Sequence, residues 1–351
     1  MPRRTFPVNP SPPMKAWQQI STGTPERAFA LRELPDPEPR PNQVLIRSEG
    51  FGLNYADTMA MRGLYPDAPK PPSLIGYEVV GRVERCGADV PPGLEGKRVV
   101  ALTRFGGYGQ LACTDHRAVA EIPDNLDLGQ AMAMATQGIT AWYMAKMATV
   151  LLPGQRVLVH AAAGGVGQLL VQLALQQGCE VFAVAGGADK MAYLKELGVQ
   201  NPIDRHAADY AVQVQRTLGN ERLDVSFNPV GGSTFKKDWK LLGSGGRLVL
   251  FGASERGTGL ISTLRFGLRM GLLSPILLIT RSKSIIGVNI LRISDHKPQL
   301  LADCLQGAVS ALVNEKLKAR THPPFAEADL PKALSLLASS RSIGKVVVKW
   351  D

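Results

Sequence analysis

A glycine-rich hexapeptide is the first group of residues whose spacing indicates a chemical role. Ala162-Ala163-Gly164-Gly165-Val166-Gly167 follows a short apolar run, Arg156 to His160, and precedes apolar residues at helical spacing. Between a strand and a helix, the middle glycine lets a diphosphate approach the backbone, and the last lets helix and strand pack closely. The helix start adds unpaired N–H groups and a partial positive charge. The pattern predicts a dinucleotide-binding loop over Ala163 to Gly167, and the alternative is a tight turn without a ligand.

The end of the next apolar run indicates which dinucleotide would bind. The sequence there is Ala185-Gly186-Gly187-Ala188, without the carboxylate that would hold the adenosine ribose hydroxyls of NAD. Lys190 and Arg205 lie nearby, and a cation suits a 2′-phosphate, which a carboxylate would repel. We therefore expect NADPH as the cofactor, held in part by Lys190 and Arg205. The alternative is that both residues are solvated surface charges.

The elements around the loop predict the architecture. After Leu128, strand-like runs alternate with helical spacing, which is typical of a doubly wound parallel sheet with helices on both faces. Before it, short β-type runs separated by Pro and Gly predict a compact, mainly β domain. The expected strands of the first part are 44–47, 78–84 and 98–102, and those of the second are 156–160, 180–185, 201–204, 224–227, 247–251 and 284–288.

Composition narrows the possible classes of protein. A length of 351 residues suggests about two domains. The net charge is +10, but no dense Lys/Arg tract favours nucleic-acid binding. The four cysteines fit no metal or disulfide spacing, which suits a reducing compartment and a cytoplasmic protein. The Pro-rich start, 1–13, is expected to be a disordered extension rather than a secretory signal.

Several further stretches together resemble a known family. They are Gly52-Leu53-Asn54-Tyr55-Ala56-Asp57, Arg62-Gly63-Leu64-Tyr65-Pro66, Gly76 to Gly81, Gln137 to Ala141, His160 to Gly167, Gln172 to Ala174, Pro229 to Gly232 and Gly344 to Val347. With these motifs the chain, from about Met14 to Trp350, resembles the zinc-independent medium-chain dehydrogenase/reductases on the quinone oxidoreductase branch. Residues 270–293 are most similar to the synaptic vesicle membrane protein homologues within it. Two positions differ from the usual pattern: Arg205 stands where the family often has Tyr, and Asn228-Pro229 precede the Gly-Gly pair where Asp is usual.

The resemblance implies a fold and a set of binding residues. It implies a Rossmann NADP-binding domain over 128–289 and a mainly β GroES-like substrate domain over 14–127 and 290–351. The last strand, Lys345 to Trp350, is then expected to return to the N-terminal domain. The further cofactor contacts that the resemblance implies are Thr140, Val230, Phe251, Gly252 and Lys345. For Thr140 a helix N-cap is an additional interpretation.

No metal site is expected. Zinc members of the superfamily hold the ion with Cys, His and Cys or Glu. Here Leu53-Asn54 stand near the first Cys position, Gly76-Tyr77-Glu78 replaces Gly-His-Glu, and the four-Cys structural lobe is missing. Glu78 is expected to be a buried hydrogen-bonding carboxylate. Without a Lewis acid, hydride addition to a quinone or activated alkene is an easier task than alcohol oxidation.

The expected catalytic residues come from the same signature. Asn54 is a candidate hydrogen-bond donor to the substrate oxygen or to the nicotinamide ribose, and Asp57 is expected to hold its loop. Tyr65 is either a proton donor or an aromatic wall of the pocket. The function that follows is an NADPH-dependent reductase of an apolar carbonyl compound or quinone.

Two other functions and one question of assembly stay open. The chain could be an enoyl (thioester) reductase, or an NADPH-binding lipid- or membrane-associated protein with little turnover. The apolar stretch 260–279 is interrupted by Arg265, Arg269 and Pro275, which argues against a membrane span. A partly buried pocket cover is favoured over membrane contact. The resemblance implies a homodimer formed through the cofactor domain.

Overall fold

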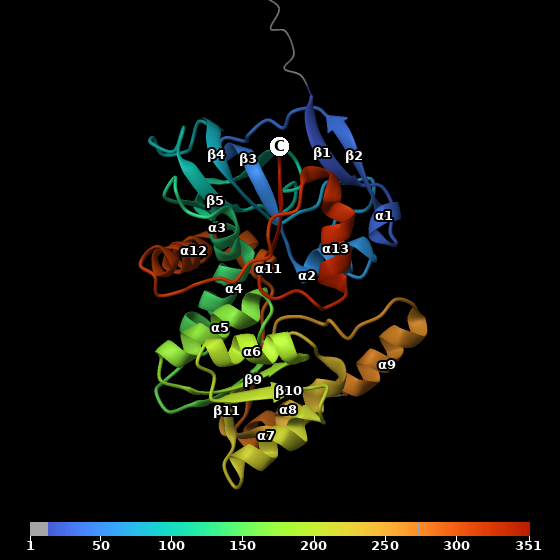
Figure 1. Ribbon diagram of the computed structural model, residues 1–351, viewed down its shortest axis with the longest axis vertical. Helices are drawn as coiled ribbons and strands as arrows, with labels where there is room; N and C mark the ends of the chain where they lie inside the picture. The colour runs from blue at the N-terminus through green and yellow to red at the C-terminus, as the bar shows by residue number, and fades with distance from the viewer. Residues whose placement is uncertain (1–12, 272–273) are drawn as a thin grey trace, which may run out of the picture.

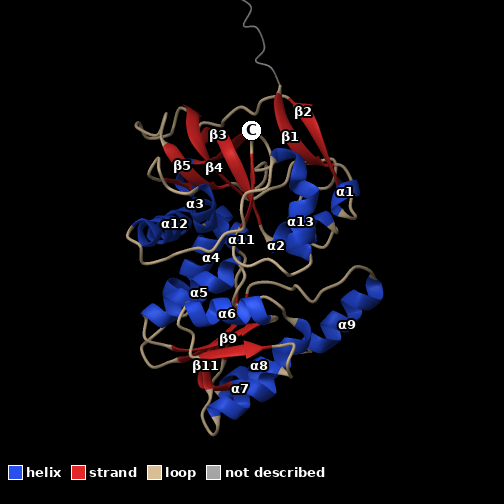
Figure 2. Cartoon of the chain, viewed as in Figure 1, coloured by secondary structure: helices blue, strands red, loops and turns tan. Residues whose placement is uncertain are grey.

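The computed structural model describes residues 13–271 and 274–351. The expected extension, residues 1–13, therefore lies outside the described residues except for Pro13. The chain forms two β-sheet regions with a layer of helices between them (Figure 1). The upper region is mainly strands and the lower one alternates strands and helices (Figure 2).

The lower region is a doubly wound parallel sheet, as the alternating pattern predicts. Its strand order is β10-β9-β8-β11-β12-β13, and all neighbouring pairs run parallel. Its strands are β8 (Arg156–His160), β9 (Glu180–Ala185), β10 (Asn201–Asp204), β11 (Leu223–Asn228), β12 (Leu242–Leu250) and β13 (Ser284–Gly287). The chain runs outward from β8 to β10 and then returns to place β11 beside β8. This reversal creates a crevice at the carboxyl ends of β8 and β11, where ligands of such sheets bind.

Helices cover both faces of this sheet because its strands are apolar on both sides. Four of the six residues that form β9 have no or almost no exposed surface. In Figure 1, α5 and α6 lie on one face and α7 and α8 on the other. Their bounds are α5 (Gly165–Gln176), α6 (Ala188–Glu196), α7 (Tyr210–Leu218) and α8 (Phe235–Leu241). The lower region is therefore a Rossmann fold.

The upper region is an antiparallel sheet that includes the end of the chain. Its order is β14-β3-β4-β5-β7, with β6 also paired to β3, and β1 and β2 form a separate pair. The bounds are β1 (Met14–Gln19), β2 (Phe29–Leu34), β3 (Gln43–Leu53), β4 (Glu78–Cys86), β5 (Arg98–Leu102), β6 (Leu111–Asp115), β7 (Val119–Glu121) and β14 (Val346–Lys349). The pairing of β14 with β3 brings the C-terminal strand back to the N-terminal sheet, as expected.

The remaining helices lie beside the upper sheet or between the regions. A nearly continuous helical rod begins at α3 and continues through a π-helical turn, α4 and a second π-helical turn to Ala148. The segment after β13 contains one short helix, α11, and then two helices from Pro298 onward, α12 and α13, the number that the sequence predicts for this tail. The bounds are α1 (Pro25–Ala28), α2 (Tyr55–Met61), α3 (Leu128–Ala133), α4 (Ile139–Trp142), α11 (Ile290–His296), α12 (Pro298–Val313) and α13 (Leu330–Ala338).

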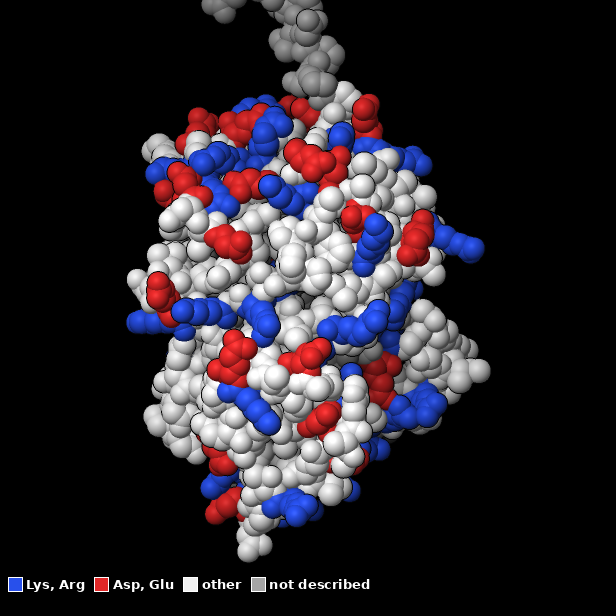
Figure 3. Space-filling model, in the orientation of Figure 1, with Lys and Arg blue, Asp and Glu red and all other residues white. Residues whose placement is uncertain are grey.

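Two helices between β12 and β13 have no buried residue, namely α9 (Leu260–Met270) and α10 (Pro275–Arg281). Leu260, Ile261 and Leu268 are 84%, 85% and 69% exposed. Figure 3 shows an uncharged surface over the outer side of α9. The segment 260–281 is the one stretch of the described chain that is long and apolar enough to cross a membrane, by length and composition alone. Nothing within the described chain covers this outer face, while the inner face of α9 is half-buried, so the expected partly buried cover stays a prediction.

Candidate functional site

The glycine-rich loop has the geometry of a phosphate cradle. Gly164 is the N-cap of α5 and has extended backbone angles. A Cβ on Gly167 would lie 2.2 Å from the carbonyl oxygen of Ala161, and one on Gly165 would lie 2.1 Å from Oε1 of Gln137. At Gly164 the nearest atom would be 3.1 Å away, so its backbone has an open side. Because the first N–H groups of a helix have no partner within the helix, the loop fits a diphosphate.

The C-terminal motif touches the same loop. The Gly344 N–H donates to the carbonyl oxygen of Ala163 at 2.9 Å. A Cβ on Gly344 would lie 1.8 Å from the carbonyl oxygen of Arg320, so only glycine fits there. This contact links β14, which belongs to the upper sheet, to the predicted diphosphate site.

Cations gather beside the end of β9. A Cβ on Gly186 would lie 2.6 Å from Nε2 of His206 and 2.9 Å from Nε of Arg205. The Lys190 ammonium donates to the carbonyl oxygen of Ser340 at 2.5 Å. Burial and the charge of Arg205 both lower the pKa of Lys190. Two cations that repel one another beside two glycines form a receptive site for an anion.

The carboxylate that precedes Arg205, Asp204, is already engaged by backbone donors. Asp204 Oδ1 accepts from the backbone N–H of His206 at 2.9 Å and from that of Gly187 at 3.4 Å. It therefore stabilises the turn and is not positioned as a partner for ribose hydroxyls. The sequence interpretation missed His206, although its place next to Arg205 was a usable signal.

Asn54 lies at the start of α2 and is 6% exposed. Its Nδ2 donates to Glu78 Oε1 at 2.7 Å, and its Oδ1 accepts from Nε2 of Gln137 at 3.2 Å and from the Lys345 ammonium at 3.3 Å. Both ends of the amide are thus engaged within the protein. A direct bond from Asn54 to a substrate would have to replace the bond to Glu78, and its catalytic role stays a prediction.

Glu78 and Lys345 form a fully buried ion pair. Oε2 of Glu78 also accepts from the Thr136 N–H at 2.7 Å, and the Lys345 ammonium donates to the Leu53 carbonyl at 3.2 Å. Burial lowers the pKa of Lys345, against the attraction of Glu78. The expectation that Glu78 is a buried hydrogen-bonding carboxylate agrees with this arrangement. The Lys345 ammonium points to Glu78 and has no exposed surface, and its expected contact with the cofactor stays a prediction.

The same pair bears on metal binding. A glutamate that is neutralised by a buried ammonium is not available as a metal ligand. Throughout residues 13–271 and 274–351 no three side chains of His, Cys, Asp or Glu lie close enough together to hold an ion.

Asp57 is fully buried in the first turn of α2. Its Oδ2 accepts from the Asn54 N–H at 2.6 Å, which closes the turn as expected of a residue that holds the loop. Its Oδ1 has no hydrogen-bond partner in the described structure. Burial raises the pKa of Asp57 to about 7, against the opposing effect of the Asn54 bond.

Tyr65 is part of an aromatic wall. Its ring meets that of Tyr77 edge-on with centroids 6.0 Å apart, and Tyr77 packs on Phe105 at 5.6 Å. Burial raises the pKa of Tyr65 to about 12. The phenol is therefore protonated at neutral pH, which suits a hydrogen-bond donor better than a group that gives up its proton.

The other predicted cofactor residues lie around the switch point. Thr140 is inside the helical rod, where its hydroxyl donates to the Thr136 carbonyl at 2.5 Å. The N-cap interpretation is wrong, because the backbone is already helical before Thr140 and Gly138 precedes α4. Val230 follows β11, and its carbonyl accepts from the Glu255 N–H at 3.2 Å. Phe251 and Gly252 follow β12, and a Cβ on Gly252 would lie 2.6 Å from the Pro229 carbonyl oxygen. The loops after β11 and β12 thus pack tightly together.

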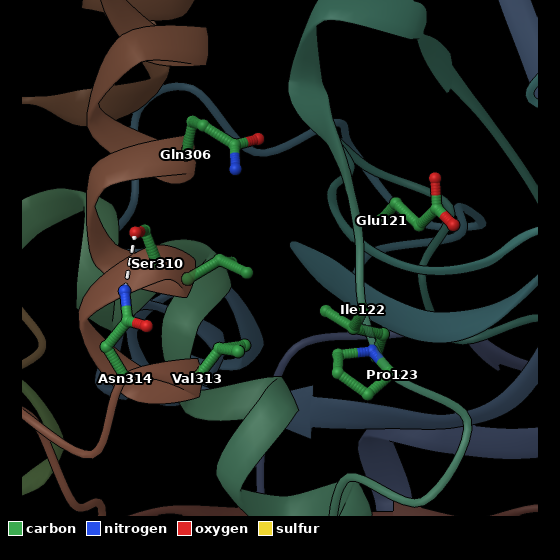
Figure 4. Close-up of a pocket in the computed structure, with 8 residues that line it drawn as sticks. Glu121, Ile122, Pro123, Gln306, Ser310, Val313 and Asn314 are labelled. Carbon is green, nitrogen blue, oxygen red and sulfur yellow. Dashed lines mark hydrogen bonds between the residues drawn. The ribbon is translucent and has the colours of Figure 1, made fainter.

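The upper and lower regions meet near these loops. The Tyr55 hydroxyl donates to the Ser254 carbonyl at 3.4 Å. Beside α9 a cavity of about 210 Å³ is lined by Glu255, Ser262, Arg265, Phe266 and Arg269. A larger cavity of about 370 Å³ opens between α12 and the segment after β7 (Figure 4), and it contains none of the predicted site residues.

Comparison with known proteins identifies the family. Residues 40–144 match the alcohol dehydrogenase GroES-like domain, and residues 165–306 match the zinc-binding dehydrogenase family. A quinone oxidoreductase of Pseudomonas aeruginosa is 29% identical over 337 residues, which cover 95% of this chain and 99% of that protein. The synaptic vesicle membrane protein VAT-1 homologs of Danio rerio and Homo sapiens are 29% and 36% identical over 90% and 64% of this chain. The matches span 66% and 56% of those two proteins.

Solved structures agree with this grouping. A quinone oxidoreductase of Pseudomonas syringae aligns with a TM-score of 0.84 at 28% identity, covering 96% of this chain and 99% of that one. The human VAT-1 homolog-like protein aligns with a TM-score of 0.83 at 26% identity, covering 97% and 98%. A mycobacterial protein complexed with NADPH aligns with a TM-score of 0.82 at 27% identity, covering 96% and 99%. With its glycine-rich loop, its two sheets and these relatives, the chain belongs to the medium-chain dehydrogenase/reductase superfamily, on the zinc-independent quinone oxidoreductase branch.

Proposed function

We propose that this protein is an NADPH-dependent, zinc-free reductase that passes hydride to a quinone or an activated enone. The observation that carries the proposal is the pair of cations near the end of β9, Lys190 and Arg205, next to a loop that fits a diphosphate. This combination suits a dinucleotide with a 2′-phosphate. The mycobacterial relative that was solved with NADPH supports the same cofactor.

The chain's residues would hold the two halves of the cofactor separately. The backbone of Ala163 to Gly167 would bind the diphosphate, and the cations beside β9 would bind the 2′-phosphate. Val230, Phe251 and Gly252 would flank the nicotinamide half, since their loops leave the carboxyl ends of β11 and β12. When bound, NADPH supplies the hydride.

On the substrate side, the aromatic wall would orient the acceptor. The Tyr65 phenol stays protonated because its pKa is raised to about 12, so it can donate a hydrogen bond to the oxygen on which negative charge develops. Asp57 would keep Asn54 and the start of α2 in place through its bond to the Asn54 N–H. No step of this scheme needs a metal ion.

A second enzymatic function has its own support. A polyketide synthase subunit of Mycobacterium tuberculosis is 28% identical over 92% of this chain, although the match spans 14% of that protein. This similarity favours an enoyl reductase that acts on a thioester. A third possibility, an NADPH-binding protein associated with lipid or membrane and with little turnover, is supported by the exposed apolar face of α9.

A substrate panel separates these functions. NADPH and NADH oxidation would be followed by absorbance with an ortho-quinone, a para-quinone, an uncharged enone and an enoyl thioester. We expect the fastest turnover with NADPH and a quinone or enone. Turnover confined to the thioester would favour the second function. NADPH binding without turnover on any acceptor would favour the third, and a preference for NADH would contradict the cofactor assignment.

We further propose a cytoplasmic homodimer in which a second copy of the chain covers α9 and α10. Two features of neighbouring segments support this: the apolar outer faces of both helices, and the edge strand β13, which follows α10 and pairs on one side with β12. An open strand edge next to an exposed apolar surface is a favourable place for a symmetric contact.

The mass in light scattering tests the assembly. Wild type should have twice the mass of one chain, and Leu264→Glu with Leu268→Glu on α9 should yield monomer. Val212→Glu, an equally exposed apolar residue on α7 at 65%, is the matched control and should stay dimeric. If the wild type is a monomer and sediments with anionic vesicles, the partner of α9 and α10 is a lipid surface and not a second copy of the chain.

A further inference from the structure

One buried carboxylate lies behind the two strands from which the predicted cofactor loops depart. Asp238 is on α8 and has no exposed surface. Its oxygens accept from Nε2 of His160 at 3.0 Å, from the Tyr210 hydroxyl at 2.7 Å, from the Ser226 hydroxyl at 2.8 Å and from Nδ2 of Asn228 at 2.6 Å. His160 is the last residue of β8 and Asn228 is the last residue of β11. These neighbouring strands define the switch point of the sheet.

The carboxylate determines which way the Asn228 amide faces. A carboxylate accepts hydrogen bonds and cannot donate them, so the NH₂ group of Asn228 must point to Asp238. The amide oxygen then faces the loop after β11, where it accepts from the N–H groups of Val230 at 2.8 Å and Gly231 at 2.9 Å. A flipped amide would present NH₂ to these two donors and lose both bonds.

This loop needs such support because of its backbone conformation. Gly231 and Gly232 have φ angles of 67° and 51°, in the left-handed region. A Cβ on Gly231 would lie 3.0 Å from the Phe266 ring, and Met270 Sδ accepts from the Gly232 N–H at 3.1 Å. The loop is therefore held between Asn228 on one side and α9 on the other.

Hydrogen bonds connect this loop to the upper region through Ser254. The Pro229 carbonyl accepts from the Ser254 N–H at 3.0 Å, and the Ser254 carbonyl accepts from the Tyr55 hydroxyl at 3.4 Å. A chain of hydrogen bonds thus runs from Asp238 through Asn228 and the loop to Tyr55, in the substrate-domain signature.

The sequence departs from the family pattern at this point. The branch usually has an aspartate where this chain has Asn228, and the buried carboxylate that contacts this position here is Asp238 on α8. We infer that Asp238 is a positioning residue, which orients Asn228 and thereby fixes the Pro229–Gly232 loop for the nicotinamide half of the cofactor. The inference rests on the proposed NADPH function.

Three variants test the inference. Asp238→Asn removes the group that orients the amide, and Asn228→Asp places two carboxylates in contact. The double variant Asn228→Asp/Asp238→Asn moves the charge back to β11 and restores a donor–acceptor pair between the two side chains. Titration of each protein with NADPH and with 2′,5′-ADP, which has the adenosine half without nicotinamide, separates the two halves of the site.

For each single variant we expect NADPH to bind about tenfold more weakly, the effect of about one lost hydrogen bond, with 2′,5′-ADP unchanged within about twofold. The double variant should recover NADPH affinity to within about threefold of wild type. Ser226→Ala is the matched control, since it removes a donor to the same carboxylate without touching the amide. It should lower the unfolding temperature and leave NADPH affinity unchanged.

Equal weakening of both ligands, or a loss of NADPH affinity in Ser226→Ala as large as in Asp238→Asn, would overturn the positioning role. If Asp238→Asn does not fold, Asn228→Ala carries the same expectation, because it leaves the bonds from His160, Tyr210 and Ser226 to Asp238 intact. Wild-type protein that binds neither nucleotide would contradict the proposed function itself, a different outcome from either of these.

Discussion

Removal of the Lys190 ammonium is the most direct test of the cofactor assignment. Lys190→Ala deletes a partly buried cation whose charge interacts with that of Arg205, without touching the diphosphate loop. If the ammonium binds the 2′-phosphate, NADPH should lose affinity and NADH, which lacks that phosphate, should not. Arg205→Ala makes the same test with an exposed cation.

The expected magnitudes follow from burial. A hydrogen bond to a charged group contributes about 1.5–3 kcal/mol, so Lys190→Ala should weaken NADPH binding by about 10- to 150-fold. An exposed ion pair contributes about 0.2–1 kcal/mol, so Arg205→Ala should weaken it by less than about sixfold. Because the charge of Arg205 lowers the pKa of Lys190, the two cations are coupled, and the double variant should depart from additivity.

The assay is titration of nucleotide fluorescence at low and high salt, with Lys195→Ala as the matched control. Lys195 is an exposed lysine on the same helix, α6, and should leave both affinities unchanged. The preference for NADPH over NADH should collapse in Lys190→Ala and should fall with salt in wild type. An equal loss for NADPH and NADH, or none for either, would show that the cations beside β9 do not contact a 2′-phosphate.

Three further predictions concern the loop, Asp57 and the buried ion pair. Gly164→Ala should fold, because its Cβ would meet only one atom, at 3.1 Å, but it should lose NADPH binding in calorimetry, because the Cβ would occupy the open side of the backbone. Gly167→Ala should lose NADPH binding and also unfold at a lower temperature. A Gly164→Ala protein with normal affinity would exclude this loop as the diphosphate site. Burial raises the pKa of Asp57 from 3.8 to about 7, so between these pH values the folded state binds more protons than the unfolded chain. The free energy of unfolding should therefore fall by about 4 kcal/mol as the pH rises from 3.8 to about 7. Asp57→Asn should flatten this part of the curve of unfolding free energy against pH, and an unchanged slope would contradict the raised pKa. Lys345→Met should lower the free energy of unfolding, measured by chemical denaturation, by about 3–5 kcal/mol, because Glu78 is left buried and unpaired. The double variant Glu78→Gln/Lys345→Met should recover part of this loss. Equal stability of the single and double variants would contradict the pairing of Glu78 with Lys345.

Local sequence signals predicted the lower sheet well. Each strand from β8 to β13 overlaps an expected run, because strands buried on both faces must be apolar throughout and the helices between them show their own spacing. The phosphate loop was equally predictable, because its geometry requires glycine. At Gly165 and Gly167 a Cβ would collide with neighbouring atoms, so the glycine pattern in the sequence reports the conformation of the loop.

Features that depend on contacts between residues far apart in the sequence could not be predicted from it. Glu78 and Lys345 are 267 positions apart and meet because β14 pairs with β3 next to β4. The N-cap interpretation of Thr140 was wrong because the helical rod continues through it, supported by packing that local spacing does not encode. The bonds to Asp238 come from three elements of the lower region, β8, α7 and β11, and a charged residue within a short helix gives no sign of them in the sequence.

The orientation of α9 is another feature that the sequence did not indicate. The spacing of apolar residues identifies an amphipathic helix, but it does not say which face is turned to the protein. In α9 the face with Phe266 and Arg269 contacts the loop after β11 and Glu255, and the face with Leu264 and Leu268 is exposed. The inner face therefore touches the segment that Asn228 holds, while the outer face is available to a second copy. Any contact that moves α9 would reach the Pro229–Gly232 loop through Phe266 and Met270, so assembly and the nicotinamide half of the site share one helix.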